Sequence, residues 1–265
     1  VVTGTSSNFE TSGGFGPNQV STILGLGAFI FFSRLLLESK NAVFFIINLG
    51  LLFYLSFRGL VTFSRGGMMT SVAMIVILLF VVYRLINSQA KNTLVVFIFI
   101  SCFAFAGVWF YSSSQTSGLI ENRYTNKDAL GREKKSKLSG REDIMGSEIK
   151  MFKENPVFGV GAGRGRELRG GIGYEQGVNS HNELTRMLGE HGSFGLIGLI
   201  ILFLMPIIYF FKKDINYNIY TLPFLIFWLL TLNHAAMRLA APAFIYALSL
   251  LKVYTLEEKP TVHRE

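Results

Sequence analysis

The sequence has few charged side chains and almost no cysteine. Charged residues make up 16% of the 265 residues, whereas a soluble domain usually carries about a quarter. The single cysteine, Cys102, excludes an internal disulfide and a cysteine-based metal site. The chain also lacks a Walker motif, an H-x-x-x-H pair and a D-x-D motif. We therefore expect an activity that needs neither a nucleotide cofactor nor a metal ion.

The net charge of +8 does not indicate a nucleic-acid-binding protein. The 25 Lys and Arg residues are spread over loops and the ends of apolar runs, as expected from the positive-inside bias of membrane proteins. The sequence contains no basic helix and no aromatic RNA-binding motif. We expect a lipid bilayer, and no nucleic acid, among the partners.

Long apolar runs are what the sequence has in abundance. Hydrophobic residues make up 50% of the chain, and runs of about 18 or more apolar residues are typical of transmembrane helices. The sequence predicts an all-α, polytopic membrane protein with about seven spans in this chain. The predicted spans are Val20–Leu37, Ala42–Phe57, Met68–Leu85, Thr93–Tyr111, Ser193–Phe211, Tyr217–Asn233 and Leu239–Tyr254.

These spans divide the chain into five parts. We expect an extracytoplasmic segment over residues 1–19, four spans over 20–111, a large extracytoplasmic loop over 112–192, three spans over 193–254 and a cytoplasmic tail over 255–265. The sequence begins at Val1 with a polar stretch, so we interpret its start as a truncation point in a longer membrane protein.

The orientation follows from Lys and Arg in the short loops. Nine basic residues lie on one side of the predicted spans and three on the other. The three are Arg58, Arg65 and Arg238. The side with nine is predicted to be cytoplasmic, which places the 112–192 loop outside the membrane.

The long loop carries signals of ordered structure. Ser139 and Glu142 form a capping-box pattern. The helix that follows places Arg141, Met145, Ile149 and Phe152 on one stripe, and Asn155–Pro156 is expected to end it.

Two further features complete the loop. The glycine-dense stretch 159–165 is either an ordinary turn or a phosphate-binding nest, because it lacks dinucleotide-binding spacing. A second capping box, Ser180 to Glu183, predicts a helix that starts near His181 and continues to Gly192.

Polar residues gather on the predicted outer side, and they suggest where chemistry takes place. Arg65 lies at the start of a span beside Gly66 and Gly67, an arrangement that suits an anionic headgroup or, more simply, anchors the span. His181 is either an ordinary loop histidine or a residue at an anion-attracting helix start. The other members are Arg58, Arg141, Arg164, Arg166, Arg169, Arg186, Glu190 and Arg238.

Four ordered segments resemble the O-antigen ligase/polymerase superfamily of bacterial membrane glycosyltransferases. They lie in this order over nearly the whole chain, and the ordered set is more specific than any single motif. The segments are Gly14-Phe-Gly-Pro-Asn18, then Phe63-Ser-Arg-Gly-Gly67, then Gly140-Arg141 with the helix leading to Asn155-Pro-Val-Phe-Gly-Val-Gly161, and last Asn179-Ser-His-Asn182 followed by Glu190-His-Gly192.

The resemblance implies transfer of a glycan from an undecaprenyl-diphosphate carrier to a sugar hydroxyl at the outer face of the bacterial inner membrane. The acceptor is a lipid-core sugar for a ligase and another repeat unit for a polymerase. By resemblance, Arg65 and Arg141 hold the diphosphate, and His181 corresponds to the family's loop histidine.

We add further candidates on the same side of the membrane. Arg164 and Asn182 are expected to contact the diphosphate. His181 is expected to accept the proton of the acceptor hydroxyl, with Glu190 or Glu183 as an alternative base.

Two other functions fit a polytopic protein. A transporter or flippase would carry paired ionisable residues inside its spans, and the predicted spans are nearly free of charge in their middles. A non-catalytic partner in a polysaccharide assembly complex is the other alternative.

Overall fold

A computed structural model of the chain describes residues 4–7, 9–134, 141–169, 179–211 and 218–251. In these ranges the regular structure is helical, and one isolated bridge joins Lys127 to Glu133. The α-helices are α1 Pro17–Leu37, α2 Ala42–Val61, α3 Arg65–Leu85, α4 Ser88–Gln115, α5 Leu119–Tyr124, α6 Arg141–Glu154, α7 Arg164–Leu168, α8 Glu183–Phe211, α9 Thr221–Thr231 and α10 Ala240–Ser249. Short 3-10 helices cover η1 Glu10–Ser12 and η3 Ala235–Arg238.

Five helices are long and apolar enough to cross a membrane. They are α1, α2, α3, α4 and α8, with lengths of 21, 20, 21, 28 and 29 residues. Each contains one of the first five predicted spans, and many of their large apolar side chains are exposed. Such an apolar outer surface suits a hydrocarbon environment. The prediction of a helical membrane protein is therefore confirmed.

The last two predicted spans form shorter helices than expected. Helices α9 and α10 have 11 and 10 residues, which corresponds to roughly 15 Å each, about half of a hydrocarbon core. Pro223 and Pro242 lie near their starts, where a missing N–H does no harm. Helix α9 ends at Thr231, because the chain turns to an extended conformation at His234 before η3. Residues 217 and 252–254 of these predicted spans lie outside the described ranges.

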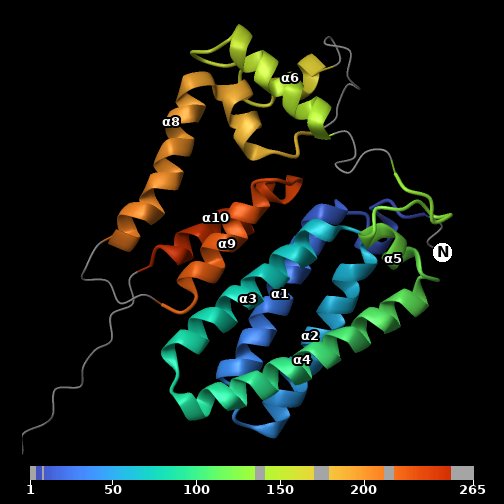
Figure 1. Ribbon diagram of the computed structural model, residues 1–265. Helices are drawn as coiled ribbons and strands as arrows, with labels where there is room; N and C mark the ends of the chain where they lie inside the picture. Colours follow the sequence, from blue (N-terminus) through green and yellow to red (C-terminus); the bar gives the residue numbers. More distant parts are fainter. Residues whose placement is uncertain (1–3, 8, 135–140, 170–178, 212–217, 252–265) are drawn as a thin grey trace, which may run out of the picture.

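Helix α1 lies at the centre of the bundle and packs on α2 and α3 (Figure 1). The contact with α3 depends on glycine, since a Cβ at Gly67 would lie 2.3 Å from the backbone of Ser21 and Thr22. Helix α9 packs on α3, and α10 packs on α9. Phe29 of α1, Met74 of α3 and Phe227 of α9 lie in one buried core. This packing brings the starts of α1 and α3 and the end of α9 to the same end of the bundle.

The predicted loop contains the helices α5, α6 and α7 and the first turns of α8. Helix α6 packs on α8 above that end of the bundle (Figure 1). It ends at Glu154, directly before Asn155–Pro156, as predicted. Helix α8 is bent at Gly192, whose φ of 59° and ψ of −136° interrupt the helix. Because a left-handed φ strains other residues, Gly192 separates the part of α8 in the loop from the predicted span, as expected.

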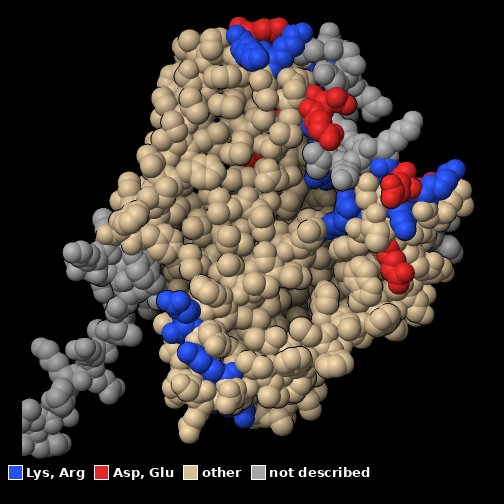
Figure 2. Space-filling view, viewed as in Figure 1, with Lys and Arg blue, Asp and Glu red and all other residues tan. Residues whose placement is uncertain are grey.

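Charges differ between the two ends of the bundle. On the face shown in Figure 2, the lower end carries Lys and Arg without acidic neighbours, whereas the upper end carries both signs. This distribution agrees with the positive-inside argument. The orientation itself stays a prediction.

Candidate functional site

A cleft of about 290 Å³ lies where the helix ends meet the loop. Its walls come from α1, α3, α5 and α6, from the end of α9 and from the turn that follows it. The residues that line it are Asn18, Arg65, Gly66, Met69, Thr70, Arg123, Arg141, Leu230, Asn233 and His234. Segments that are far apart in the sequence therefore form one polar site at one end of the bundle.

Arg65, Arg123 and Arg141 give the cleft a strong positive potential. Burial, followed by the charges of Arg65 and Arg141, lowers the pKa of Arg123. Burial and then the charge of Arg65 lower the pKa of Arg141. Within the described ranges, none of the three forms a salt bridge with a carboxylate. Half-buried guanidinium groups that repel one another are stabilised by an anion.

The backbone before α3 holds Arg123 in place. Its Nε donates a hydrogen bond of 2.8 Å to the carbonyl oxygen of Phe63, and its Nη2 donates one of 3.3 Å to Ser7 Oγ. Phe63 is fully buried and has a φ of 56°, an uncommon conformation for a bulky residue. This turn directs the Phe63 carbonyl to Arg123 and starts α3 two residues later.

The N-terminus of α3 also contributes to the cleft. Ser64 is the N-cap residue, but its side chain makes no cap hydrogen bond to α3. Its hydroxyl instead donates to Asn18 Oδ1 at 2.7 Å. Free amides at a helix start carry partial positive charge, and Gly66 of this turn lines the cleft. The sequence-based idea that Gly66 and Gly67 allow close approach is supported, with Gly67 contacting α1 and Gly66 lying beside His234.

Two histidines are neutral near pH 7. Burial, followed by the charges of Arg141, Arg238 and Arg169, lowers the pKa of His181 to about 4. Burial, Arg141 and then His181 lower the pKa of His234 to about 4. The expected role of His181 as a proton acceptor requires this neutral form, which here comes from burial and neighbouring arginines and not from a helix start.

The capping box at Ser180 was wrong. Helix α8 begins at Glu183, and Asn182 Oδ1 accepts from the amides of Leu184 and Thr185 at 2.9 and 3.2 Å. Asparagine is as good an N-cap as serine, and Asn182 directly precedes the first residue of α8, whereas Ser180 lies further upstream. The Glu183 amide donates to the Leu232 carbonyl at 2.8 Å, which ties α8 to the end of α9. The other capping residue, Ser139, lies outside the described residues.

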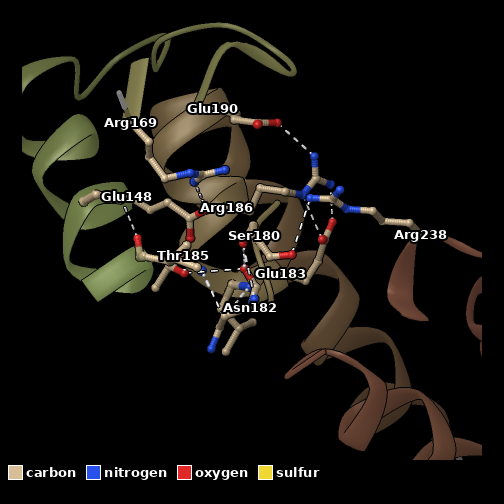
Figure 3. Close-up of polar contacts among 12 residues, drawn as sticks. Glu148, Arg169, Ser180, Asn182, Glu183, Thr185, Arg186, Glu190 and Arg238 are labelled. Atoms are coloured by element: carbon tan, nitrogen blue, oxygen red, sulfur yellow. Dashed lines mark hydrogen bonds and ion pairs between the residues drawn. The ribbon is translucent and has the colours of Figure 1, made fainter. Parts of the chain in front are cut away.

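A buried network fixes α6 and α8 relative to each other (Figure 3). Glu148 and Arg169 form an ion pair of 2.8 Å with side chains that are 2% exposed. Thr185 Oγ1 donates to Glu148 Oε2 at 2.6 Å. Beside it, Arg186 is paired with both Glu183 and Glu190. This network therefore holds α6 on α8, and with it Arg141 at the start of α6.

Comparison with known proteins gives the family. The sequence profile of the O-antigen ligase family matches residues 49–200, more than half of the chain. The chain belongs to the O-antigen ligase family. The resemblance found in the motifs is confirmed, and membership implies an enzyme of glycosyltransferase type. No curated protein and no solved structure matches the chain.

The structure brings together some of the residues predicted for an O-antigen ligase-like site. Arg65 and Arg141 both line the cleft. His181 and Asn182 do not line the cleft but lie beside it. His181 lies near Arg141 and His234, and Asn182 Nδ2 donates to Asn233 Oδ1 at 3.2 Å. Asn182 therefore supports a lining residue while it caps α8.

Two predicted residues lie elsewhere. Glu190 does not line the cleft; it is 6% exposed and pairs with Arg186 at 2.9 Å. Arg164 begins α7 and is exposed to solvent, and it does not line the cleft either. The stretch before it forms a turn with left-handed φ at Gly159, Gly161 and Gly163. In the described part of the chain, no cluster of three His, Cys, Asp or Glu suits a metal ion.

Sequence reasoning missed Arg123 and His234. Arg123 follows a turn in a polar stretch without periodicity, so nothing local distinguishes it. His234, with Asn233, is a polar interruption between two apolar segments. Asn233 and His234 lie at a turn predicted on the outer side, and this polar pair was the sequence signal that could have identified His234 as a site residue.

Proposed function

We propose that this O-antigen ligase family member transfers a glycan from an undecaprenyl-diphosphate carrier to a sugar hydroxyl at the outer face of the bacterial inner membrane. One observation carries the proposal: three arginines from α3, α5 and α6 line a single cleft at the end of a membrane-type helical bundle. A cleft of this kind suits the diphosphate of a lipid-linked donor, whose polyprenyl tail stays in the bilayer.

The arginines have a direct role in the chemistry. As the bond between sugar C1 and the diphosphate oxygen breaks, that oxygen keeps the bonding electrons and the diphosphate gains negative charge. Guanidinium groups bind phosphate oxygens in bidentate fashion, and preorganised donors stabilise charge that develops in the transition state. Arg65, Arg123 and Arg141 therefore bind the leaving group, and the free amides of α3 add to their field.

His181 accepts the proton in this proposal. The acceptor oxygen attacks C1, and its proton moves to the imidazole, which must be neutral beforehand. The lowered pKa of His181 keeps that form dominant at pH 7. Glu183 and Glu190 are weaker candidates for the base, because both are engaged by Arg186.

A reconstituted transfer assay tests the proposal. The protein in lipid nanodiscs would be supplied with an undecaprenyl-diphosphate-linked glycan and either a lipid-core acceptor or a second glycan donor. We expect transfer, release of undecaprenyl diphosphate, and no transfer from a monophosphate-linked glycan. Acceptor choice then identifies a ligase or a polymerase.

The alternatives give different results. Movement of the intact lipid-linked glycan across a vesicle membrane without transfer would identify a transporter and overturn the proposal. Activity that appears only when other assembly proteins are added, and that survives loss of the three arginines, would identify a non-catalytic partner.

A further inference from the structure

His234 is a buried histidine without a structural partner. It follows α9 in an extended conformation and is the N-cap residue of η3. Its side chain is 7% exposed, yet neither Nδ1 nor Nε2 has a hydrogen-bond partner among the described residues. Buried polar groups in proteins are almost always hydrogen-bonded, and exceptions often mark sites where a ligand completes the arrangement.

The imidazole lies beside the start of α3 in the arginine-lined cleft. His234 lines the cleft together with Arg65, Gly66 and Arg141. A Cβ built on Gly66 would lie 3.3 Å from His234 Cδ2 and 3.5 Å from Nε2. The Nε2 edge is thus adjacent to the uncapped first turn of α3, beside Arg65.

The charges around His234 define its ligand. Arg141 and His181 are the groups that act on it electrostatically, and Arg65 and Arg123 share its cleft. No carboxylate of the described residues lines this cleft. A carboxylate-bound structural histidine and a metal-binding histidine are both poor fits, whereas an anion that already pairs with the arginines fits well.

We propose that His234 is a further catalytic residue that donates an imidazole N–H to an oxygen of the donor diphosphate. The inference rests on the proposed function and adds a binding residue to it. Imidazole in its neutral form has one N–H donor, so it binds phosphate without adding a fourth full positive charge to the cleft. Its other nitrogen also has no hydrogen-bond partner in the described part of the chain.

This role differs from that of His181. His181 takes a proton from the acceptor hydroxyl, whereas His234 keeps its proton and shares it with the leaving diphosphate. The hydrogen bond strengthens as the diphosphate gains charge, so it contributes more to the transition state than to the bound donor. Loss of His234 should therefore lower kcat as well as weaken binding of the diphosphate.

Side-chain replacements at His234 separate donation from packing. His234→Ala and His234→Leu remove both ring nitrogens, while His234→Asn and His234→Gln return an N–H near Nδ1 or Nε2. His191→Ala is the matched control, because His191 is a half-buried histidine of α8 that does not line the cleft. Each variant would be purified in nanodiscs and checked for thermal unfolding; the Leu variant carries the test if the Ala variant is unstable.

Binding of undecaprenyl diphosphate and glycan transfer would be measured for each protein, with undecaprenyl monophosphate and phosphatidylglycerol as competing anionic lipids. Loss of a hydrogen bond to a charged group corresponds to about a 10- to 100-fold effect. We expect kcat/KM to fall by about that factor in the Ala and Leu variants, with a lower kcat and weaker diphosphate binding. Either the Asn or the Gln variant should recover part of the loss.

The outcomes distinguish this inference from the proposed function. Wild-type protein that binds the diphosphate no better than the monophosphate or phosphatidylglycerol would contradict the proposed function. Wild-type protein that prefers the diphosphate, together with Ala and Leu variants within about threefold of it, would overturn the role of His234 alone. Equal losses in all four variants would also overturn it, because they would indicate packing and not donation.

Discussion

The buried ion pair between Glu148 and Arg169 should hold Arg141 in the site. Both side chains are 2% exposed, their contact is 2.8 Å long, and Thr185 donates to the second carboxylate oxygen. Glu148→Gln keeps the shape and the Thr185 contact but removes the carboxylate charge that pairs with the buried Arg169 guanidinium. Breaking one partner of such a pair costs about 3–5 kcal/mol.

This loss of stabilisation should make local opening of α6 from α8 more frequent. Hydrogen exchange of the α6 amides reports such opening, and 3–5 kcal/mol corresponds to acceleration by roughly 10²- to several 10³-fold. Transfer activity should fall in parallel, since Arg141 is the first residue of α6. The measurement is hydrogen exchange with mass spectrometry on the protein in nanodiscs.

Glu154→Gln is the matched control on the same helix. Glu154 pairs with Lys150 at 3.9 Å, and both side chains are 57% exposed, so its loss should change little. Exchange in the Glu148→Gln protein that stays within about threefold of wild type would refute the reasoning. It would mean that other contacts hold α6 on α8.

Three other perturbations give distinct results. The pH profile of kcat/KM should stay flat from pH 8 to about pH 6 and fall only toward pH 4. The lowered pKa values of about 4 keep His181 and His234 neutral above that range, and acid removes the neutral form. An inflection near pH 6.5 would contradict this prediction. Gly67→Ala should destabilise the protein by at least 1–3 kcal/mol in thermal unfolding, since its Cβ would lie 2.3 Å from the α1 backbone, whereas Gly107→Ala has open space and should not. In a Cys102→Ala background, a cysteine at Ala129 should react with an impermeant thiol reagent from outside and one at Ser88 only after permeabilisation; the reverse pattern would invert the orientation.

The helices were largely predictable because apolar length and period are local properties. The long spans followed from composition, and the end of α6 followed from Asn155–Pro156. The last two spans were overestimated, since hydropathy does not reveal that the chain turns at His234 to contact the cleft. The polar residues between the two apolar segments indicated a turn near His234, but they did not determine the residue at which α9 ends.

The site was predictable only in part, because it is built from long-range contacts. Arg65 and Arg141 were found through motifs and do share one cleft. Arg123 is placed by the Phe63 carbonyl, a contact across 60 positions that no local pattern shows. The Ser180 capping box failed because Asn182 competes for the same role and takes the α8 amides.

The central claim is that the arginine cleft binds the donor diphosphate, and lysine substitution tests it most directly. Arg65→Lys and Arg141→Lys keep the charge but lose the bidentate fork. The measurement is kcat/KM for an undecaprenyl-diphosphate-linked glycan in nanodiscs, with Arg84→Lys at the other end of α3 as the control. We expect each cleft variant to lose at least about tenfold while the control keeps wild-type values. Wild-type kcat/KM in both cleft variants would contradict the account.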